Sequence, residues 1–142
     1  MAPHSWPARV YYQHTDAGGV VYHGAYIDFM EAARSEMMRA MGFNLAEWGR
    51  AGILFVVHRL DITYRKPGRL GDELRILTRC VEVSGARLVL EQSVVRDGTT
   101  LAFAIVTLVC ISAADFRAAP IPNDVKAVFE GDKASSGPGL GT

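Results

Sequence analysis

The amino-acid sequence predicts an α+β fold in which an antiparallel sheet wraps around one long central helix. A short strand-like segment comes first and a long segment of helical composition follows. Four long strand-like segments then complete the order, with no second long helix between them. Glycine-containing tight turns separate several of these strands, and strands joined by tight turns are antiparallel. A sheet that curls around a single apolar helix satisfies this order.

The first two predicted elements are a strand over residues 9–14 and a helix over residues 24–41. Gly18 and Gly19 break the strand. The segment that follows is rich in alanine and methionine, which favour helix. Apolar residues cover most of its circumference, so we expect it to be largely buried. Gly42 is expected to end the helix in the left-handed conformation.

A short helix and four strands follow. Asn44 and Glu47 have the spacing of a capping box, which predicts a helix that stops near residues 49–52. A strand is predicted over residues 53–66, with the even-numbered positions 54–64 on one face. Three further strands are predicted over residues 72–84, 86–96 and 100–113, and a short terminal helix over residues 123–129.

The size, charge and cysteine content of the chain bound its organisation. Its 142 residues predict a single domain over residues 1–130 and a flexible C-terminal tail over residues 131–142. Lys plus Arg and Asp plus Glu both number 15, so no net charge directs the protein to nucleic acid or an anionic membrane. The sequence lacks a secretory signal and a membrane-spanning run, which predicts a cytoplasmic protein. Cys80 and Cys110 are expected to be buried thiols rather than disulfide or metal ligands.

Side chains able to carry chemistry concentrate in residues 11–26, where the first strand is predicted to give way to the long helix. Such a junction can place a titratable side chain beside exposed backbone N–H groups, as attack on an acyl carbonyl requires. Asp16 is the central candidate, because a carboxylate can act as a nucleophile or as the base that activates water. The alternative is an ordinary turn residue, since Asp is common in turns.

His23 stands at the predicted start of the long helix, and two roles are open for it. Its imidazole could orient water or the Asp16 carboxylate. Alternatively, its backbone N–H could join the first N–H groups of the helix in polarising an acyl oxygen. No Ser, Thr, Asp or Asn occupies residues 22–25, so no side-chain cap competes for those donors. A purely structural histidine is the alternative. Tyr12 also has two interpretations, as a phenol that hydrogen-bonds near the carboxylate or as a core tyrosine.

The spacing Tyr12-x3-Asp16-x6-His23, with Gly-Gly-Val-Val between the acid and the histidine, closely resembles the signature of the YbgC-type acyl-CoA thioesterases. These form a branch of the 4-hydroxybenzoyl-CoA thioesterase-like hotdog family. The resemblance extends more loosely over residues 9–129. Further matches are Glu31-x2-Arg34-x-Glu36, Phe55-Val56-Val57 and Pro67-x-Arg69-Leu70-x-Asp72. The resemblance implies a hotdog fold and an acyl-CoA thioester hydrolase that releases free CoA and a carboxylic acid.

The resemblance also implies roles for individual residues. Asp16, His23 and Tyr12 are the expected catalytic residues, with the helix N-terminus at His23 as the oxyanion site. Whether Asp16 is the nucleophile or the general base stays open. The expected substrate-binding residues are Gly19, Val20, Val21, Tyr22, Val57, His58, Arg65 and Lys66. No metal and no cofactor are expected, since coenzyme A is part of the substrate.

Two histidines depart from the family pattern. His14 stands where many relatives carry a second acid, and an imidazole there could shift the pH range of activity. His58 stands where close relatives often carry arginine, on a strand that in this family lines the neighbouring subunit's pocket. A surface or hydrogen-bonded histidine is the alternative for each. Glu31 is expected to form an intrahelical salt bridge with Arg34 rather than to act in catalysis.

Hotdog subunits join their sheets edge to edge, so the resemblance implies a homo-oligomer, a dimer of hotdogs that assembles as a tetramer. Whether the protein is a tetramer or only a dimer stays open. Acyl-CoA is the expected substrate, with acyl carrier protein as a second candidate partner. A non-catalytic acyl-thioester binding protein and a hotdog enoyl-thioester hydratase are alternative functions. Hydratases usually carry a D-x4-H pattern, and the spacing of six residues between Asp16 and His23 argues against that activity.

Overall fold

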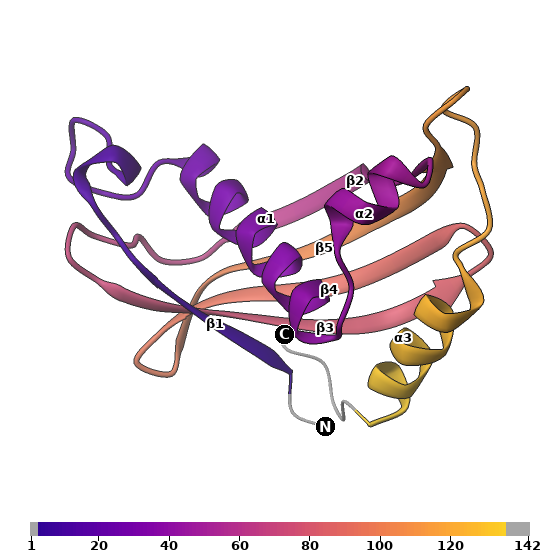
Figure 1. The fold of residues 1–142 in the computed structure, drawn as a ribbon. Helices are drawn as coiled ribbons and strands as arrows, with labels where there is room; N and C mark the ends of the chain where they lie inside the picture. The colour runs from indigo at the N-terminus through magenta and orange to yellow at the C-terminus, as the bar shows by residue number, and fades with distance from the viewer. Residues whose placement is uncertain (1–2, 136–142) are drawn as a thin grey trace.

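Five strands form one antiparallel sheet, and the long helix α1 (His23–Ala40) lies across its concave face (Figure 1). The computed structural model describes residues 3–135. The strand order is β1-β3-β4-β5-β2, so β1 and β2 form the two edges. The strands are β1 (His4–Arg9), β2 (Ile53–Tyr64), β3 (Glu73–Ser84), β4 (Arg87–Arg96) and β5 (Thr99–Ser112). The predicted sheet around one long helix is confirmed.

The first strand lies earlier in the chain than the sequence predicts. β1 pairs with β3 along its whole length and ends at Arg9. Residues Tyr12–His14 then form one turn of 3-10 helix, in which the His14 amide donates to the Tyr11 carbonyl (2.9 Å). The strand predicted over residues 9–14 is therefore wrong. Tyrosine favours strands, but Tyr11 and Tyr12 lie in a tight turn. Local hydrogen bonds here replace pairing with a neighbouring strand.

Helix α1 follows its predicted boundaries closely. At its C-terminus Gly42 has a φ of 92°, and the Phe43 amide donates to the Met38 carbonyl (2.9 Å), so the predicted left-handed cap is confirmed. The hydrophobic side chains that the helix buries in the core are Ala25, Tyr26, Phe29, Met30, Ala33, Met37 and Met38. The helix is thus anchored against the sheet along one broad face, which fixes the position of its N-terminus.

Strand β2 contains a bulge that the sequence pattern did not predict. Val57 pairs with Leu108 and Arg59 with Thr107, so His58 has no partner in the ladder. Before the bulge Phe55 packs against the core, and after it the even-numbered Leu60, Ile62 and Tyr64 do so. The prediction that one set of alternate residues faces the same side throughout is wrong, because the extra residue at the bulge switches the inward face.

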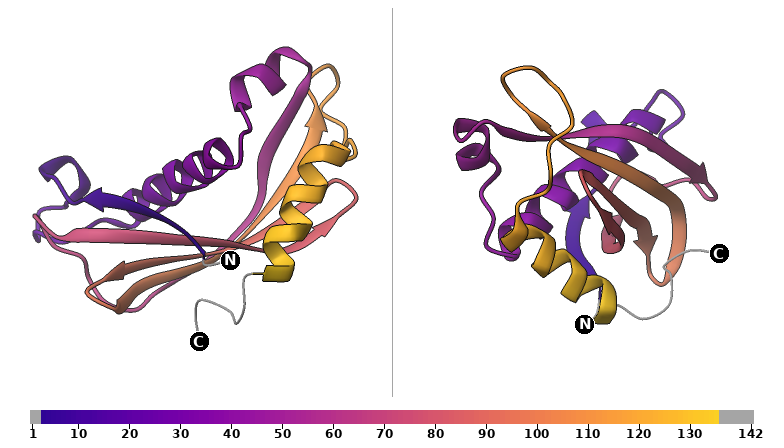
Figure 2. Two further views of the ribbon diagram at one scale, coloured as in Figure 1. Left: turned by 60° about the horizontal axis from the view of Figure 1, so that its bottom comes forward. Right: turned by 90° about the vertical axis from the view of Figure 1, so that its right-hand side faces the viewer.

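Two shorter helices complete the fold. Asn44 caps α2 (Leu45–Arg50) by accepting hydrogen bonds from the amides of Ala46 and Glu47, which confirms the predicted helix start. Helix α3 (Asn123–Ser135) lies on the same side of the curled sheet as α1 (Figure 2). Phe129 of α3 is buried in the core cluster.

The C-terminal boundary differs from the expectation. α3 continues to Ser135, past residue 131, where the tail was predicted to start. Asp132 of this last turn is buried and accepts a hydrogen bond from the Cys80 amide of β3 (3.2 Å). The rest of the predicted tail, residues 136–142, lies outside the described residues.

Two further expectations concern the interior and the membrane. Cys80 and Cys110 are both buried and form no disulfide, as predicted, and burial raises the pKa of the Cys110 thiol. No helix within residues 3–135 is long and apolar enough to cross a membrane.

Candidate active site

Asp16 lies at the start of a tight turn between β1 and α1. Its amide donates to the Val20 carbonyl, and the Gly19 amide donates to the Asp16 carbonyl, both at 3.0 Å. The carboxylate is exposed, and its Oδ1 accepts a hydrogen bond from the Gly18 amide (2.9 Å). Among the described residues none donates to Oδ2. The bond to Oδ1 therefore orients the carboxylate while Oδ2 stays open to substrate or water.

The geometry of this turn favours glycine at both positions. Gly19 has a φ of 77°, in the left-handed region that residues with side chains rarely adopt. A Cβ on Gly18 would lie 3.2 Å from Asp16 Oδ1, which is tighter than an ordinary contact. Glycine at position 19 permits the turn, and glycine at position 18 leaves room for the carboxylate.

The turn is anchored to the connection between β2 and β3. The Val21 amide donates to the Gly68 carbonyl (2.9 Å), and Val20 forms an isolated antiparallel bridge with Arg69. The Gly68 amide in turn donates to the hydroxyl of Tyr26 on α1 (2.9 Å). Gly68 is buried, and a Cβ there would lie 2.9 Å from the Val21 side chain. Close packing at Gly68 thus joins three segments of the chain.

The N-terminus of α1 adjoins this anchored turn. Tyr22 is the N-cap residue, and its side chain makes no capping hydrogen bond. The first N–H groups of an α-helix have no acceptor within the helix, and they carry the positive end of its dipole. The His23 ring stacks on Tyr64 of β2, with centroids 4.4 Å apart. The helix terminus is therefore fixed in place with backbone donors that no side chain caps, as the sequence predicted.

A hollow of about 230 Å³ opens at this terminus. It is lined by Val20, Val21, His23, Tyr26, Tyr64, Arg65, Lys66 and Pro67. The structure thus brings together five of the predicted site residues, from two segments that lie far apart in the sequence. Sequence reasoning missed Tyr26 and Tyr64. Tyr26 lies one helical turn after His23 and could have been found from that spacing.

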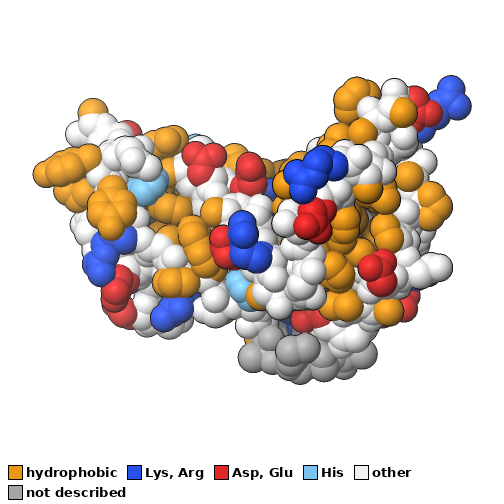
Figure 3. Space-filling model, in the orientation of Figure 1, with side chains coloured by type: hydrophobic (Ala, Val, Ile, Leu, Met, Phe, Trp, Pro, Cys, Tyr) orange, Lys and Arg blue, Asp and Glu red, His pale blue; other side chains and the backbone are white. Residues whose placement is uncertain are grey.

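Six of the predicted site residues do not line this hollow, namely Asp16, Tyr12, Gly19, Tyr22, Val57 and His58. Tyr12 is 81% exposed, and its phenol forms no hydrogen bond with Asp16 among those of the described residues. Tyr22 is 40% exposed, and Gly19 is exposed within the turn. Figure 3 shows hydrophobic side chains on the surface at the end of the molecule that holds the segment between β1 and α1. The large exposed hydrophobic residues of that segment are Tyr11, Tyr12 and Tyr22.

Val57 and His58 lie further along the exposed edge strand β2. His58 is exposed at the bulge, and Val57 is 50% exposed. Val57 lines a separate hollow of about 280 Å³ between α1, α2 and the sheet, together with Glu31 and Arg34. Within one subunit these residues therefore do not join His23.

The predicted salt bridge between Glu31 and Arg34 is not among the ion pairs of residues 3–135. Arg34 is buried, and its Nη1 donates instead to Gln92 Oε1 (2.9 Å). Gln92 Nε2 donates to the Met30 carbonyl (3.0 Å) and to Thr78 Oγ1 (2.9 Å). Burial lowers the pKa of Arg34, and the Glu31 charge opposes this effect. Arg34 thus turns inward to the sheet, and the prediction based on helical spacing alone is wrong.

The segment Pro67-x-Arg69-Leu70-x-Asp72 supports the turn that carries Asp16. Asp72 Oδ2 accepts hydrogen bonds from the Arg69 amide (2.8 Å) and from Arg96 Nη1 (2.7 Å). Burial would raise the pKa of Asp72, but these hydrogen bonds and the charges of Arg96 and Arg69 lower it overall. The carboxylate therefore has a structural role, holding the β2–β3 connection against which Val20 and Val21 bond.

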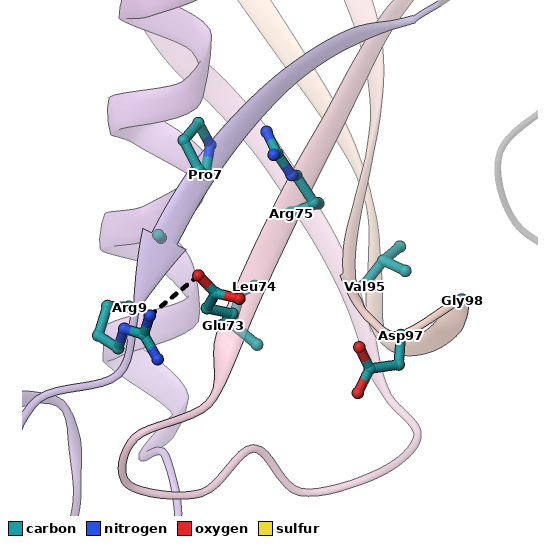
Figure 4. A pocket seen from close by; sticks show the side chains of 9 residues that line it. Pro7, Arg9, Glu73, Leu74, Arg75, Val95, Asp97 and Gly98 are labelled. Carbon is teal, nitrogen blue, oxygen red and sulfur yellow. Dashed lines mark hydrogen bonds and ion pairs between the residues drawn. The ribbon is translucent and has the colours of Figure 1, made fainter.

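A larger hollow, of about 510 Å³, lies elsewhere, between β1, β3 and the β4–β5 turn (Figure 4). Arg9 and Glu73 form an ion pair on its wall (2.9 Å), and Arg75 and Asp97 also line it. None of the predicted site residues lines this hollow. Its two arginines are matched by two acids, so it offers no excess charge to a ligand.

Comparison with known proteins shows that the chain is similar to thioesterases. The thioesterase superfamily model matches residues 18–103. The chain is 39% identical over 126 residues to the acyl-CoA thioester hydrolase YbgC of Escherichia coli O6:H1, covering 88% of this chain and 94% of that protein. It is 40% identical over 128 residues to the acyl-CoA thioesterase YbgC of Haemophilus influenzae, covering 88% and 93%.

The fold also matches solved structures. A hypothetical protein, TT1821, from Thermus thermophilus superposes with a TM-score of 0.84 and 31% sequence identity, covering 90% of this chain and 98% of that chain. The two proteins therefore share one architecture over nearly their whole lengths.

Proposed function

Because the chain belongs to the thioesterase superfamily and to its YbgC branch, we propose that it hydrolyses acyl-CoA thioesters to free CoA and a carboxylic acid. Family membership makes it a thioester hydrolase, and the residues of the site support the finer assignment. The observation that carries it is the position of Asp16. Its exposed carboxylate begins the turn whose other end, at Val20 and Val21, lines the hollow beside the N-terminus of α1.

Asp16 supplies the attacking group in one of two ways. As a general base, it takes a proton from water while the water oxygen bonds to the thioester carbon. As a nucleophile, Oδ2 bonds to that carbon, and water then hydrolyses the resulting anhydride. In both routes the C–S bond breaks and the thiolate sulfur of CoA leaves and is protonated. The Gly18 amide bonds Oδ1, which supports an orientation in which Oδ2 is the reacting atom.

The N-terminus of α1 stabilises the oxygen on which negative charge develops. The backbone N–H of His23 is the first N–H of the helix, and the helix dipole favours an anion there. The His23 imidazole is stacked on Tyr64, which supports a role for the backbone of this residue rather than for its side chain. Tyr12 assists only if the loop or a second subunit brings its exposed phenol to the acyl group.

Substrate contacts and assembly belong to the same proposal. Arg65 and Lys66 line the hollow and are suited to the phosphates of coenzyme A. The free edge of β2 favours pairing with the same edge of a second subunit, which would bring its Val57 and His58 toward the site. We propose a homo-oligomer of such dimers, assembled as a tetramer, that acts in the cytoplasm. Acyl carrier protein is a second candidate acyl donor.

The test is thiol release from a panel of acyl-CoAs that are short, long, hydroxylated and aromatic. The wild type should release thiol from at least one class, and Asp16→Asn should lower kcat by about 10²–10⁴-fold. Asp124→Asn, at an exposed position in the first turn of α3, is the matched control and should keep full activity. Loss of an enoyl-CoA without thiol release would indicate a hydratase instead. Folded wild type that releases no thiol from any of these substrates would contradict the proposal.

A further inference from the structure

His14 and Tyr11 are joined by two hydrogen bonds across the 3-10 turn that precedes Asp16. The His14 amide donates to the Tyr11 carbonyl (2.9 Å), and the Tyr11 amide donates to His14 Nδ1 (2.8 Å). A backbone N–H can only donate, so Nδ1 must be the acceptor. The imidazole therefore carries its single proton on Nε2 and is neutral.

The same residue is tied to the start of α1. The His14 carbonyl accepts a hydrogen bond from the amide of Tyr22, the N-cap of α1 (3.2 Å). Its ring packs on Phe29 of α1, with centroids 4.6 Å apart. Asp16 follows two residues later. His14 thus links the turn before the carboxylate to the helix terminus that adjoins the hollow.

The groups that face the His14 ring come from two elements. Its own segment contributes the titratable phenol ring of Tyr11, with centroids 6.0 Å away, and the Gln13 side chain, whose amide nitrogen is placed 3.2 Å from Nε2. With a proton on Nε2, the Gln13 amide must turn by 180° so that its oxygen accepts a hydrogen bond from Nε2. Helix α1 contributes the apolar ring of Phe29. The nearest acid in sequence, Asp16, bonds the Gly18 amide instead. No carboxylate of the described residues forms an ion pair with His14. None is therefore in place to accept a hydrogen bond from a protonated Nδ1.

We propose that His14 is a positioning residue whose neutral imidazole holds the turn of Asp16 against the N-terminus of α1, so that hydrolysis is lost when this imidazole binds a proton. A proton on Nδ1 would place two N–H groups opposite each other and break the bond to Tyr11. The turn would then lose one of the two hydrogen bonds between Tyr11 and His14. Misplacing a catalytic group by about 1 Å can cost about 10²-fold in rate. The inference rests on the proposed function and concerns the regulation of that site by pH.

Two substitutions separate this role from simple packing. His14→Asn places an amide oxygen near the position of Nδ1, so it keeps an acceptor for the Tyr11 amide and cannot titrate. His14→Gln places its amide near the position of Nε2 and leaves the Tyr11 amide without that acceptor. At about pH 8 we expect the Asn variant to keep most of the wild-type kcat and the Gln variant to lose about tenfold or more, with KM little changed in both.

The pH profile gives the decisive comparison. Wild-type kcat should fall toward acid pH, because a proton on His14 Nδ1 breaks the hydrogen bond from the Tyr11 amide. The acid limb of His14→Asn should lie at lower pH than that of the wild type, because the Asn amide does not take up this proton. A purely structural role would lower the melting temperature of the variants and leave the acid limb in place. Identical pH profiles for wild type and His14→Asn would overturn the inference.

A measurement without substrate separates this inference from the proposed function. ¹⁵N NMR of the imidazole should find Nδ1 unprotonated at pH 8. The Tyr11 amide should exchange with solvent more slowly in the wild type than in His14→Gln. An Nδ1–H tautomer in an active enzyme would overturn this inference and leave the thioesterase assignment intact. The expected tautomer in a wild type that hydrolyses no thioester would overturn both the proposed function and the positioning role of His14.

Discussion

Tyr64 stacks on His23 with ring centroids 4.4 Å apart and planes inclined by 24°, and its hydroxyl donates to the His23 carbonyl oxygen at 3.4 Å. Tyr64 is the last residue of β2, and His23 is the first residue of α1. The contact therefore connects the free edge strand of the sheet to the helix terminus proposed to stabilise the oxyanion. Burial raises the pKa of Tyr64, and the neighbouring Tyr26 adds to the effect, so the hydroxyl stays a donor at neutral pH.

Replacing Tyr64 should separate its ring from its hydroxyl. Tyr64→Phe keeps the stacked ring and loses only a long hydrogen bond, so kcat should fall by less than about threefold. Tyr64→Ala removes the surface on which His23 rests, and kcat/KM should fall by about tenfold or more, with a loss of roughly 1–3 kcal/mol in stability. Steady-state kinetics and urea unfolding measure the two effects. Equal activity of the Phe and Ala variants would contradict a role for the stacked ring.

The two glycines after Asp16 should respond differently to alanine. Gly18→Ala places a methyl group 3.2 Å from Asp16 Oδ1, so we expect a drop in kcat of about tenfold or more with little change in stability. In Gly19→Ala nothing lies near the new methyl group, but the φ of 77° is unfavourable, at a cost of about 1 kcal/mol in stability.

Gly71→Ala is the matched control for this pair. Its φ is 87° and the space around its Cβ is also empty, but it lies outside the turn that carries Asp16. It should lose as much stability as Gly19→Ala while keeping wild-type kcat. Thermal unfolding and thiol release distinguish the three variants. A kcat for Gly18→Ala that matches the control would show that the orientation of Asp16 Oδ1 does not matter for the reaction.

The hotdog architecture was predictable because its signals are local. Helix composition, the cap at Asn44 and the glycine after α1 depend on residues close in sequence, and each prediction held. The errors arose where tertiary contacts override local preference. Residues 9–14 look like a strand but close a turn, and the bulge at His58 shifts the inward face of β2 to fit the curled sheet.

The site was predicted only in part for the same reason. The segment that contains Asp16 and His23 was found from its own motif. The Gly68 contact with Val21 and the stacking of Tyr64 on His23 join segments far apart in the chain, and one sequence carries no periodicity that would reveal them. The inward turn of Arg34 likewise depends on Gln92, which lies on β4.

The buried Arg34 should contribute strongly to stability. Arg34→Ala removes its hydrogen bond to Gln92 Oε1 and leaves a cavity between α1 and the sheet, so we expect a loss of about 2–4 kcal/mol. Arg39→Ala is the matched control, because that side chain is 76% exposed on the same helix and its ion pair with Glu36 is long. It should change stability by less than about 0.5 kcal/mol. Similar urea midpoints for the two variants would contradict the role of the buried network.

Asp72 provides the clearest prediction of a pH effect on stability. Two donors converge on its Oδ2, from the Arg69 amide and from the Arg96 guanidinium. Burial alone would raise the pKa of this carboxyl, but the hydrogen bonds and the two arginine charges lower it overall. A carboxyl whose pKa is lower in the folded state stabilises the fold at pH values above its unfolded pKa of about 3.9.

Asp72→Asn should therefore destabilise the protein at neutral pH and much less in acid. At pH 7 the side chain is ionised in both states, and losing its partly exposed ion pair with Arg96 should cost about 0.5–1 kcal/mol. As the pH falls through the folded pKa, the wild type loses this contribution and the difference between the two proteins should shrink toward zero. Asp97→Asn, at an exposed turn position where no described residue forms an ion pair with it, should follow the wild-type curve throughout. Urea unfolding between pH 7 and pH 3 measures the difference in unfolding free energy between the wild type and Asp72→Asn. A constant difference over this range would contradict a role for the Asp72 charge. It would mean that Asp72 stabilises the β2–β3 connection through hydrogen bonds that the amide also disrupts.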